Sequence, residues 1–375
     1  MIDTDIVVDT GLKLTCSREE LTHRLGLVSR GVSTRASVLV LTGILLRAQG
    51  GRLHLASTDM ELSLRSSLEA DIEEDGAAVV PGRLLLDIVK LLPDASVAIE
   101  HKPEEGAVIV TSGTATFRLH THAAEDFPRL PDVDGQFSAI EPEAFLDTVQ
   151  RVGRSASRDE SRPVLTGVLV RFETGRMVMA ATDSYRLSVK ETETAGALPE
   201  LDAIIPARAL QELSRLAGGA GEFQLAVREN HVIFGIADSW LTTRRIEGQF
   251  PNYNQLLPET FEHEVVLPRE ELLEVVRRVA IMAQRNSPLR LRFAEGELTV
   301  SAITQDVGEA REALPAGFTG EPMEIGFNAE FLRDGVESVE GDTLRVKLIS
   351  PLRPAVLQGE SEDYTYLIMP IRLAG

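Results

Sequence analysis

The chain has 375 residues, 43% hydrophobic and 26% charged, which excludes disordered, collagen-like and coiled-coil proteins and allows two to four domains. Its net charge of −20 argues against a nucleic-acid binder that uses its whole surface. A single cysteine, Cys16, no signal-peptide pattern and no apolar run of about 20 residues indicate a soluble cytoplasmic protein with no membrane segment.

One pattern of elements occurs three times along the chain. Each unit opens with a helix whose apolar residues recur at three- and four-residue spacing. Alternating strands joined by a corner aspartate follow, and a further strand then leads into a second amphipathic helix, begun by proline or, in the third unit, by Asn328. The corner aspartates are Asp59, Asp183 and Asp306, 124 and 123 residues apart. The opening helices are expected over 17–32, 141–157 and 268–284, and the strand-to-helix segments over 77–94, 202–219 and 323–342.

The joints between these units are rich in turn residues. They fall at 126–136 and 248–260, and each contains a Phe-Pro pair. The sequence therefore predicts three tandem, similar α+β domains. Their expected boundaries are 1–132, 133–258 and 259–375.

Arginine and lysine are concentrated on the six expected helices, whereas acidic residues gather elsewhere, as at 69–75 and 359–363. One helix with arginines on its solvated side is ordinary, but six with the same bias favour a shared basic surface. Such a surface in an acidic body attracts a polyanion to one place. With one Trp and four Tyr, the chain lacks an aromatic platform for single-stranded bases. We expect contact with phosphates that does not read sequence.

Motifs of catalysis are missing from the sequence. His120 and His122 form a His-x-His pair on one face of an expected strand, but no third metal ligand is spaced near them, so a solvated strand face is the preferred interpretation. The glycine-rich stretch 218–221 follows a helix and lacks the Lys-Ser/Thr of a phosphate loop. Neither Gly-x-Ser-x-Gly nor His-Glu-x-x-His occurs. We expect no catalytic residues, no metal and no cofactor.

From about residue 12 to 373 the chain resembles the bacterial sliding clamps, the beta subunits of DNA polymerase III. The resemblance implies a non-catalytic protein with the DNA clamp fold, in which two chains join head to tail in a six-domain ring with helices lining the hole and sheets outside. It implies that the homodimer encircles double-stranded DNA regardless of sequence and gives the replicative polymerase processivity. Other implied partners are further DNA polymerase III subunits, the clamp loader, and replication and repair proteins that carry a clamp-binding motif. The segments that carry the resemblance are ATDSYRLSV (181–189), RPVLTGVLV (162–170), GQFPNYNQLLP (248–258), EIGFNAEFLRDGV (324–336) and YLIMPIRL (366–373).

The resemblance also implies three groups of functional residues. The DNA-facing candidates are Arg24, Arg35, Arg83, Arg158, Arg162 and Arg208, of which Arg35 and Arg83 match best by position. The dimer-interface candidates are Phe117 and Leu119 on one chain and Ile281 and Met282 on the other. The candidates for a peptide-binding cleft are Leu165, Thr182, Ser184, Tyr185, Arg186, Leu187, Pro251, Leu256, Leu367, Met369, Pro370, Ile371, Arg372 and Leu373.

Two residues depart from the family pattern, and one of them leaves an alternative open. Gln255 stands where many relatives have arginine, which weakens one wall of the expected cleft. Asp159 stands where relatives often have a polar residue close to DNA, and it adds repulsion there. Together with the net charge of −20, Asp159 keeps open a specialised clamp paralogue or protein-binding scaffold that does not encircle DNA.

Overall fold

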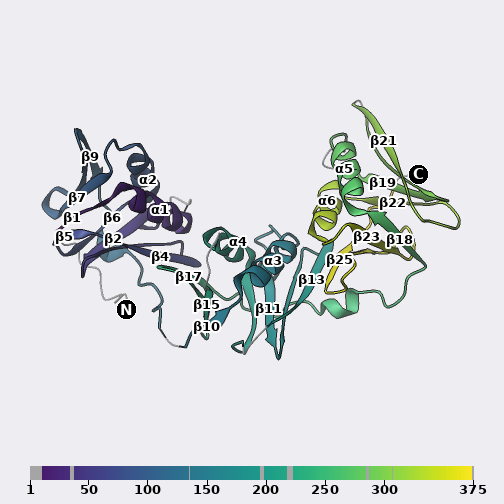
Figure 1. The fold of residues 1–375 in the computed structure, drawn as a ribbon, viewed down its shortest axis with the longest axis horizontal. Coiled ribbons are helices and arrows are strands. Elements are labelled where there is room, and N and C mark those ends of the chain that lie inside the picture. Colours follow the sequence, from purple (N-terminus) through teal and green to yellow (C-terminus); the bar gives the residue numbers. More distant parts are fainter. Residues whose placement is uncertain are drawn as a thin grey trace. The chain divides into compact units, whose positions relative to one another are not determined.

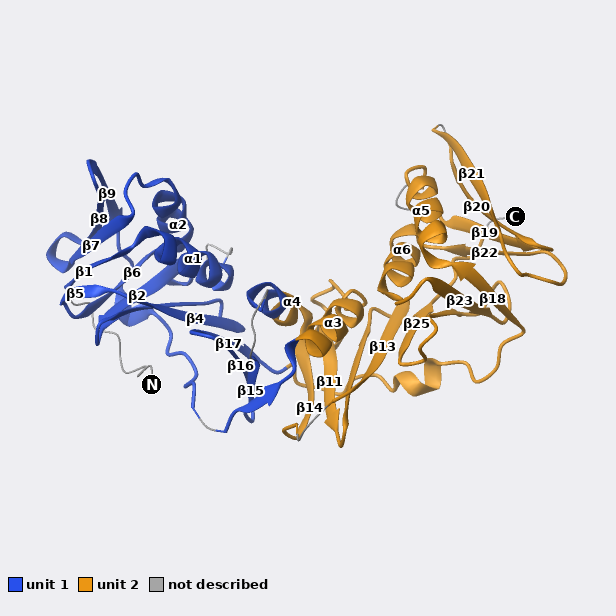
Figure 2. Ribbon diagram, in the orientation of Figure 1, with its two compact units in different colours: residues 1–142, 212–245 blue, residues 143–211, 246–375 orange. Residues whose placement is uncertain are grey.

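The computed structural model describes residues 11–33, 38–134, 136–194, 198–217, 223–283, 287–305 and 307–373. Arg35, Asp306 and the glycine-rich stretch 218–221 lie outside the described residues. The chain divides into two compact units, shown in Figure 2: unit 1 contains residues 1–142 and 212–245, and unit 2 contains residues 143–211 and 246–375.

Unit 1 contains an eight-stranded and a five-stranded antiparallel sheet, with helices α1 (Arg18–Val28) and α2 (Gly82–Leu91). Its strands are β1 (Leu12–Ser17), β2 (Gly43–Gln49), β3 (Arg52–Thr58), β4 (Leu62–Glu69), β5 (Asp71–Glu74), β6 (Gly76–Pro81), β7 (Ser96–Lys102), β8 (Ala107–Ser112), β9 (Ala115–His120), β10 (Ser138–Ile140), β15 (Phe223–Val227), β16 (His231–Ile236) and β17 (Ser239–Arg244). The strand orders are β10-β15-β16-β17-β4-β3-β2-β6 and β5-β1-β7-β8-β9 (Figure 1).

Unit 2 contains an eight-stranded and a four-stranded antiparallel sheet, with helices α3 (Pro142–Gly153), α5 (Arg269–Ala280) and α6 (Ala329–Ser338). Helix α4 (Ala207–Leu216) contributes residues to both units. The strands of unit 2 are β11 (Gly167–Glu173), β12 (Arg176–Thr182), β13 (Arg186–Glu193), β14 (Leu201–Pro206), β18 (His263–Pro268), β19 (Leu289–Ala294), β20 (Glu297–Thr304), β21 (Gly308–Pro315), β22 (Met323–Phe327), β23 (Thr343–Leu348), β24 (Ala355–Gln358) and β25 (Tyr364–Ile368). The strand orders are β14-β11-β12-β13-β25-β24-β23-β18 and β21-β20-β19-β22.

The strand orders contain one arrangement three times. The sets β6-β2-β3-β4, β14-β11-β12-β13 and β22-β19-β20-β21 run in the same order, and so do β1-β7-β8-β9, β10-β15-β16-β17 and β18-β23-β24-β25. Strand β17 pairs with β4, and β25 pairs with β13. Each eight-stranded sheet therefore joins two neighbouring repeats, which is why the compact units do not follow the three predicted domains. The predicted threefold α+β repeat is present in the fold, and the exact boundaries stay a prediction.

Side-chain caps begin two of the helices. Ser17 accepts a hydrogen bond from the Glu20 amide at 3.5 Å at the start of α1, and Asn328 accepts one from the Phe331 amide at 3.1 Å at the start of α6. The opening helices end earlier than predicted. In α1 the Ser29 hydroxyl donates to a carbonyl of the last turn at 3.0 Å, and the chain leaves the α-helix at Val28. No helix in the described ranges is both long and apolar enough to cross a bilayer.

Candidate functional site

A tight corner between β12 and β13 is closed by its own side chains. The Thr182 hydroxyl donates to the Arg186 carbonyl at 2.7 Å and accepts from the Ser184 amide at 3.1 Å. The Asp183 carboxylate accepts from the amides of Tyr185 and Arg186 at 2.9 and 3.0 Å. These short side chains satisfy the backbone of the turn, which holds Ser184 at a φ of 81°. The corner leaves the Tyr185 side chain outside, 62% exposed.

Arg186 fixes this corner to helix α6. The residue is 5% exposed, and its guanidinium donates to Asp183 at 3.0 Å and to Asp334 at 2.6 Å. It also lies 4.3 Å above the centre of the Phe331 ring. Burial alone would lower the pKa of Arg186, but Tyr366 and the two carboxylates outweigh burial and raise it. This geometry gives Arg186 a positioning role beneath the surface.

The C-terminal tail continues from β25 past the corner. The Met369 amide donates to the Tyr185 carbonyl at 2.8 Å, and the Ile371 amide donates to the Gly326 carbonyl at 2.7 Å. A Cβ atom at Gly326 would lie 2.5 Å from Leu373 Cδ2. The tail therefore packs directly on β22, at a place where a side chain would obstruct it.

The corner, the tail and the 3-10 turn Tyr253–Leu256 together expose four large apolar side chains. Tyr185 is 62% exposed, Leu256 50%, Met369 40% and Ile371 39%. We call residues 182–187, 253–256 and 369–373 the corner–tail surface. The buried cluster under it includes Leu169, Val178, Ala180, Leu187, Val189, Ile204, Val356 and Leu367, and Val164, Phe250, Tyr253 and Leu257 pack against this cluster.

The remaining cleft candidates lie in or around the same region of unit 2. Thr182, Leu187 and Leu367 are buried and support the surface from below. Those at least partly accessible are Leu165, Ser184, Pro251, Pro370, Arg372 and Leu373. Gln255 is exposed in the 3-10 turn Tyr253–Leu256. The structure thus brings together segments that are far apart in the sequence, and a peptide-binding role for them stays a prediction.

Sequence reasoning missed three residues that shape this region, namely Gly326, Phe331 and Asp334. A buried guanidinium needs buried partners, so a search of 324–336 for a carboxylate would have suggested Asp334. Phe331, one helical turn earlier on α6, follows from that choice. Gly326 gave no such signal, because only the packed tail shows why a side chain is not accommodated there.

Three of the DNA-facing candidates already have partners in the protein. The Arg24 side chain is 17% exposed and lies 3.5 Å from Glu20 and 3.7 Å from Asp238. Arg162 donates to Asp159 at 3.0 Å and to Ser184 at 3.0 Å. Arg158 is 90% exposed and lies 3.5 Å from Glu330. Hydrogen bonds from Ser161 and then from Arg162 lower the pKa of Asp159, which keeps this carboxylate ionised.

Arg83 and Arg208 are exposed as well, each near the start of a helix. Arg83 is exposed in the first turn of α2 and has no ion pair with any residue that the structure describes. Arg208 is exposed near the start of α4. Among the candidates in the described ranges, Arg83 is therefore the cation with the least competition from carboxylates.

The interface candidates lie on the edge strand β9 and in the segment that follows helix α5. Phe117 is 38% exposed on β9, whereas Leu119 on the same strand is 4% exposed and packs inside unit 1. Ile281 follows α5 and is 81% exposed. The Met282 carbonyl accepts a hydrogen bond from Thr304 at 2.5 Å, which ties this segment to β20 next to the edge strand β21.

The surroundings of His122 and Cys16 are those of residues with a structural role. Strand β9 ends at His120, and His122 lies beyond it, where its amide donates to the Val79 carbonyl at 2.8 Å. The prediction that both histidines share one face of a strand is therefore wrong. Burial raises the pKa of the Cys16 thiol to about 12, which keeps it protonated at neutral pH. No group of three potential ligands among the described His, Cys, Asp and Glu residues could hold a metal ion.

The chain matches known sequences and structures over nearly all of its length. Models of the DNA polymerase III beta subunit match as N-terminal domain at residues 12–131, central domain at 139–252 and C-terminal domain at 254–372. The beta sliding clamp of Streptomyces coelicolor is 35% identical, with 97% of this chain and 100% of that protein covered. The beta sliding clamp of Synechococcus elongatus is also 35% identical, with 96% and 100% covered.

Solved structures agree with these matches. The sliding clamp of Bacillus subtilis superposes with a TM-score of 0.90 at 26% identity, covering 97% of this chain and 100% of that one. A Pseudomonas aeruginosa DNA polymerase III beta subunit bound to griselimycin superposes with a TM-score of 0.87 at 28% identity, with the same coverage. The chain therefore belongs to the family of bacterial beta sliding clamps, the beta subunits of DNA polymerase III.

Proposed function

We propose that two copies of this chain close head to tail around duplex DNA in the cytoplasm, and that the corner–tail surface binds peptide segments of the proteins that the ring holds on DNA. As a sliding clamp the chain is a non-catalytic processivity factor. A closed ring is retained by topology, so its attraction to phosphates can be weak and independent of sequence.

Two of the edge strands, β9 and β21, support ring closure, and they carry this proposal. At the two internal junctions, the last strand of one set pairs with the last strand of the other: β17 with β4, and β25 with β13. Strand β9 is equivalent to β17 and β25, and β21 is equivalent to β4 and β13. In the described part of the chain each of these two strands has a neighbour on one side only. A second copy can supply the missing pairing of β9 with β21, as edge strands commonly do.

In the proposed interface, Phe117 and Leu119 of one copy meet Ile281 and Met282 of the other. Phe117 and Ile281 supply exposed apolar area, which the interface would bury. Leu119, already packed within its own unit, would hold β9 in place rather than make new contact. Closing both junctions in this way requires two copies and gives six repeats.

A DNA test separates the ring from a scaffold that never encircles DNA. The chain is loaded onto nicked circular DNA by a clamp loader, and the complex is then linearised. We expect retention on the circle and loss from the linear molecule. Equal retention on both, or none on either, would support the scaffold alternative.

The DNA-facing group is tested by Arg83→Glu, because this exposed arginine has no competing ion pair among the described residues. Replacing a cation with an anion removes one phosphate contact and adds repulsion, so retention should fall severalfold, most strongly at low salt. The matched control is Arg353→Glu, which makes the same charge change at an exposed turn of unit 2. Equal loss in both variants would show that net charge, and not position, is responsible. The same assay can be applied to Arg35, Arg158, Arg162 and Arg208.

The peptide-binding proposal rests on the four exposed apolar side chains of the corner–tail surface. Apolar pockets and surfaces with a few polar groups are typical of sites for short extended peptides. Met369 is unbranched and adaptable, which suits several partners, and Pro370 stiffens the tail.

Griselimycin, which the Pseudomonas aeruginosa clamp binds in its crystal structure, is a suitable probe. We expect Met369→Asp, and deletion of residues 369–375, to weaken griselimycin binding at least tenfold while the dimer mass in solution is unchanged. Leu352→Asp is the control, since Leu352 is also apolar and 65% exposed but lies outside this surface. Unchanged affinity in the two surface variants would remove the assignment.

A further inference from the structure

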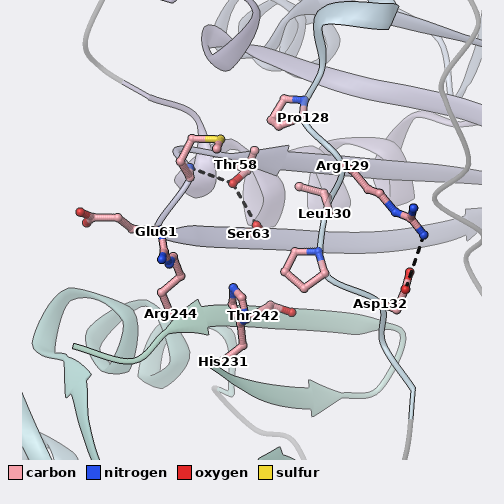
Figure 3. A pocket seen from close by; sticks show the side chains of 12 residues that line it. Thr58, Glu61, Ser63, Pro128, Arg129, Leu130, Asp132, His231, Thr242 and Arg244 are labelled. Atoms are coloured by element: carbon pink, nitrogen blue, oxygen red, sulfur yellow. Dashed lines mark hydrogen bonds and ion pairs between the residues drawn. The ribbon is translucent and has the colours of Figure 1, made fainter. Parts of the chain in front are cut away.

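Unit 1 contains a pocket that the proposed function does not use. Its volume is about 390 Å³, which is enough to hold one or two side chains of a ligand. Figure 3 shows that its walls come from the β3–β4 corner, from the segment that follows Phe127, and from β16 and β17. The lining residues are Thr58, Met60, Glu61, Ser63, Pro128, Arg129, Leu130, Pro131, Asp132, His231, Thr242 and Arg244.

This pocket lies at the counterpart of the corner–tail surface in the preceding repeat. The Thr58 hydroxyl accepts from the Met60 amide at 3.0 Å, and Met60 has a φ of 79°. The Asp59 carboxylate accepts from the Leu62 amide at 2.9 Å. The Arg244 amide donates to the carbonyl of the corner residue before Leu62 at 2.9 Å, as Met369 does to Tyr185 in unit 2. The two sites thus share a backbone frame.

The side chains on that frame differ in charge. Arg65 on β4 takes the place that Val189 has on β13, and it is 3% exposed. Its Nη2 donates to the Pro131 carbonyl at 2.7 Å, whereas Nη1 has no hydrogen-bond partner among the described residues. Burial lowers the pKa of Arg65 to about 10, so the folded protein holds this charge at some cost. A buried, incompletely paired guanidinium therefore lies beneath the segment that forms one wall of the pocket.

The lining itself contains two arginines and two carboxylates, and the buried Arg65 behind it adds a third cation. Arg129 lies 3.8 Å from Asp132, so these two charges are paired within the wall. Arg244 is exposed and has no ion pair with any described residue. Glu61 is the remaining carboxylate, at the exposed corner. Arg244 and Leu130 both line the hollow (Figure 3), and Leu130 is only 5% exposed, so a ligand would reach Arg244 and the accessible edge of Leu130.

We propose that this pocket is a second docking site, which binds an acidic peptide segment of a partner protein. A carboxylate of the segment would pair with Arg244 over the positive potential of Arg65, and an adjacent apolar or proline side chain would pack on Leu130 and Pro131. A phosphodiester backbone needs several cations in a row, whereas Arg244 is the single lining arginine without an ion pair to a described residue. This inference goes beyond the proposed function and does not require the corner–tail surface to bind peptides.

Methionine methyl NMR on the full chain can test the proposal. Met60 lines the pocket and is 56% exposed, whereas Met369 reports on the corner–tail surface. The probe is a pool of pentapeptides with Glu at the second and fourth positions, and the matched pool has Gln there. We expect the Glu pool to shift the Met60 signal in a saturable way, with little change at Met369. Arg244→Glu should weaken the response at least tenfold, Arg244→Lys should retain part of it, and the control Arg353→Glu should stay within twofold of the parent protein.

Several results would overturn the proposal. These are no Met60 shift at millimolar Glu pool, an equal shift with the Gln pool, or an undiminished shift in a folded Arg244→Glu variant. A Met60 shift produced by duplex DNA at lower concentration than by the peptides would assign the pocket to nucleic acid instead. Griselimycin binding, read at Met369, is measured in the same samples, so failure at one site is distinguished from failure at the other.

Discussion

The corners at Thr58–Leu62 and Thr182–Arg186 have the same backbone and opposite surface chemistry. In both, a threonine hydroxyl and an aspartate carboxylate satisfy the turn amides, and a non-glycine residue is held at positive φ. One corner presents Glu61 beside Arg244, whereas the other presents Tyr185 beside Met369. The comparison teaches that Thr and Asp determine the shape of the turn, while the residues after them are free to determine what it binds.

The two buried arginines should give the largest difference between the repeats. Arg186 has two carboxylate partners that are 12% and 13% exposed, and its pKa is raised. Arg186→Met would leave both carboxylates buried without a cation, so we expect the free energy of unfolding to fall by about 3–5 kcal/mol. Arg65 is incompletely paired and its pKa is lowered, so Arg65→Met should change stability by less than about 1 kcal/mol.

Urea denaturation of the two variants measures this difference. A matched pair of controls is provided by Arg186→Lys and Arg65→Lys, which keep the charge and lose the guanidinium geometry. An equal loss of unfolding free energy in the two Met variants would show that both arginines stabilise the fold alike. Arg65 would then be as well paired as Arg186, and the pocket in unit 1 would lack the incompletely paired cation that its proposed ligand needs.

The second prediction concerns the position of the tail, which contributes to the surface of unit 2. Gly326→Ala would put a methyl group 2.5 Å from Leu373 Cδ2 and 3.0 Å from the Ile371 carbonyl. The Leu373 side chain must turn away and the tail backbone at Ile371 must shift slightly, and we expect griselimycin affinity to fall about tenfold, or about 1.4 kcal/mol. Gly317→Ala is the control, because no atom lies within 4 Å of a Cβ there. Wild-type affinity in Gly326→Ala would mean that the tail position is not important for binding.

The sequence was sufficient for the repeat but not for the pairing of its charges. Alternating strands, corner aspartates and Asn328 as a helix cap follow from local rules, and these local features are present in the structure, except at Asp306, which lies outside the described residues. Arg24 and Arg83 look alike in sequence, since both lie on amphipathic helices. Only tertiary packing makes one 17% exposed and leaves the other accessible.

Long-range contacts explain the other differences. His122 leaves the expected strand because its amide pairs with Val79, about 40 residues earlier. Asp334 completes the environment of Arg186 from 148 residues away. The proposed site in unit 1 uses Arg65 on β4 and Arg244 on β17. Only the pairing of these two strands brings the two arginines into the same region. Periodicity and turn chemistry contain no information about such contacts.

The prediction with the smallest expected effect concerns the backbone conformation that the two corners share. Met60 and Ser184 have φ values of 79° and 81°, which side chains tolerate poorly. Met60→Gly and Ser184→Gly should each relieve this strain, offset in part by the added freedom of the unfolded chain, for a net gain of about 0.5–1 kcal/mol. Hydrogen exchange at the Leu62 and Arg186 amides, which bond to the two corner aspartates, measures each corner separately. Slower exchange in both variants would support a common backbone conformation at the two corners, which differ only in their exposed side chains. Slower exchange at a single corner would show that the two turns are not energetically equivalent.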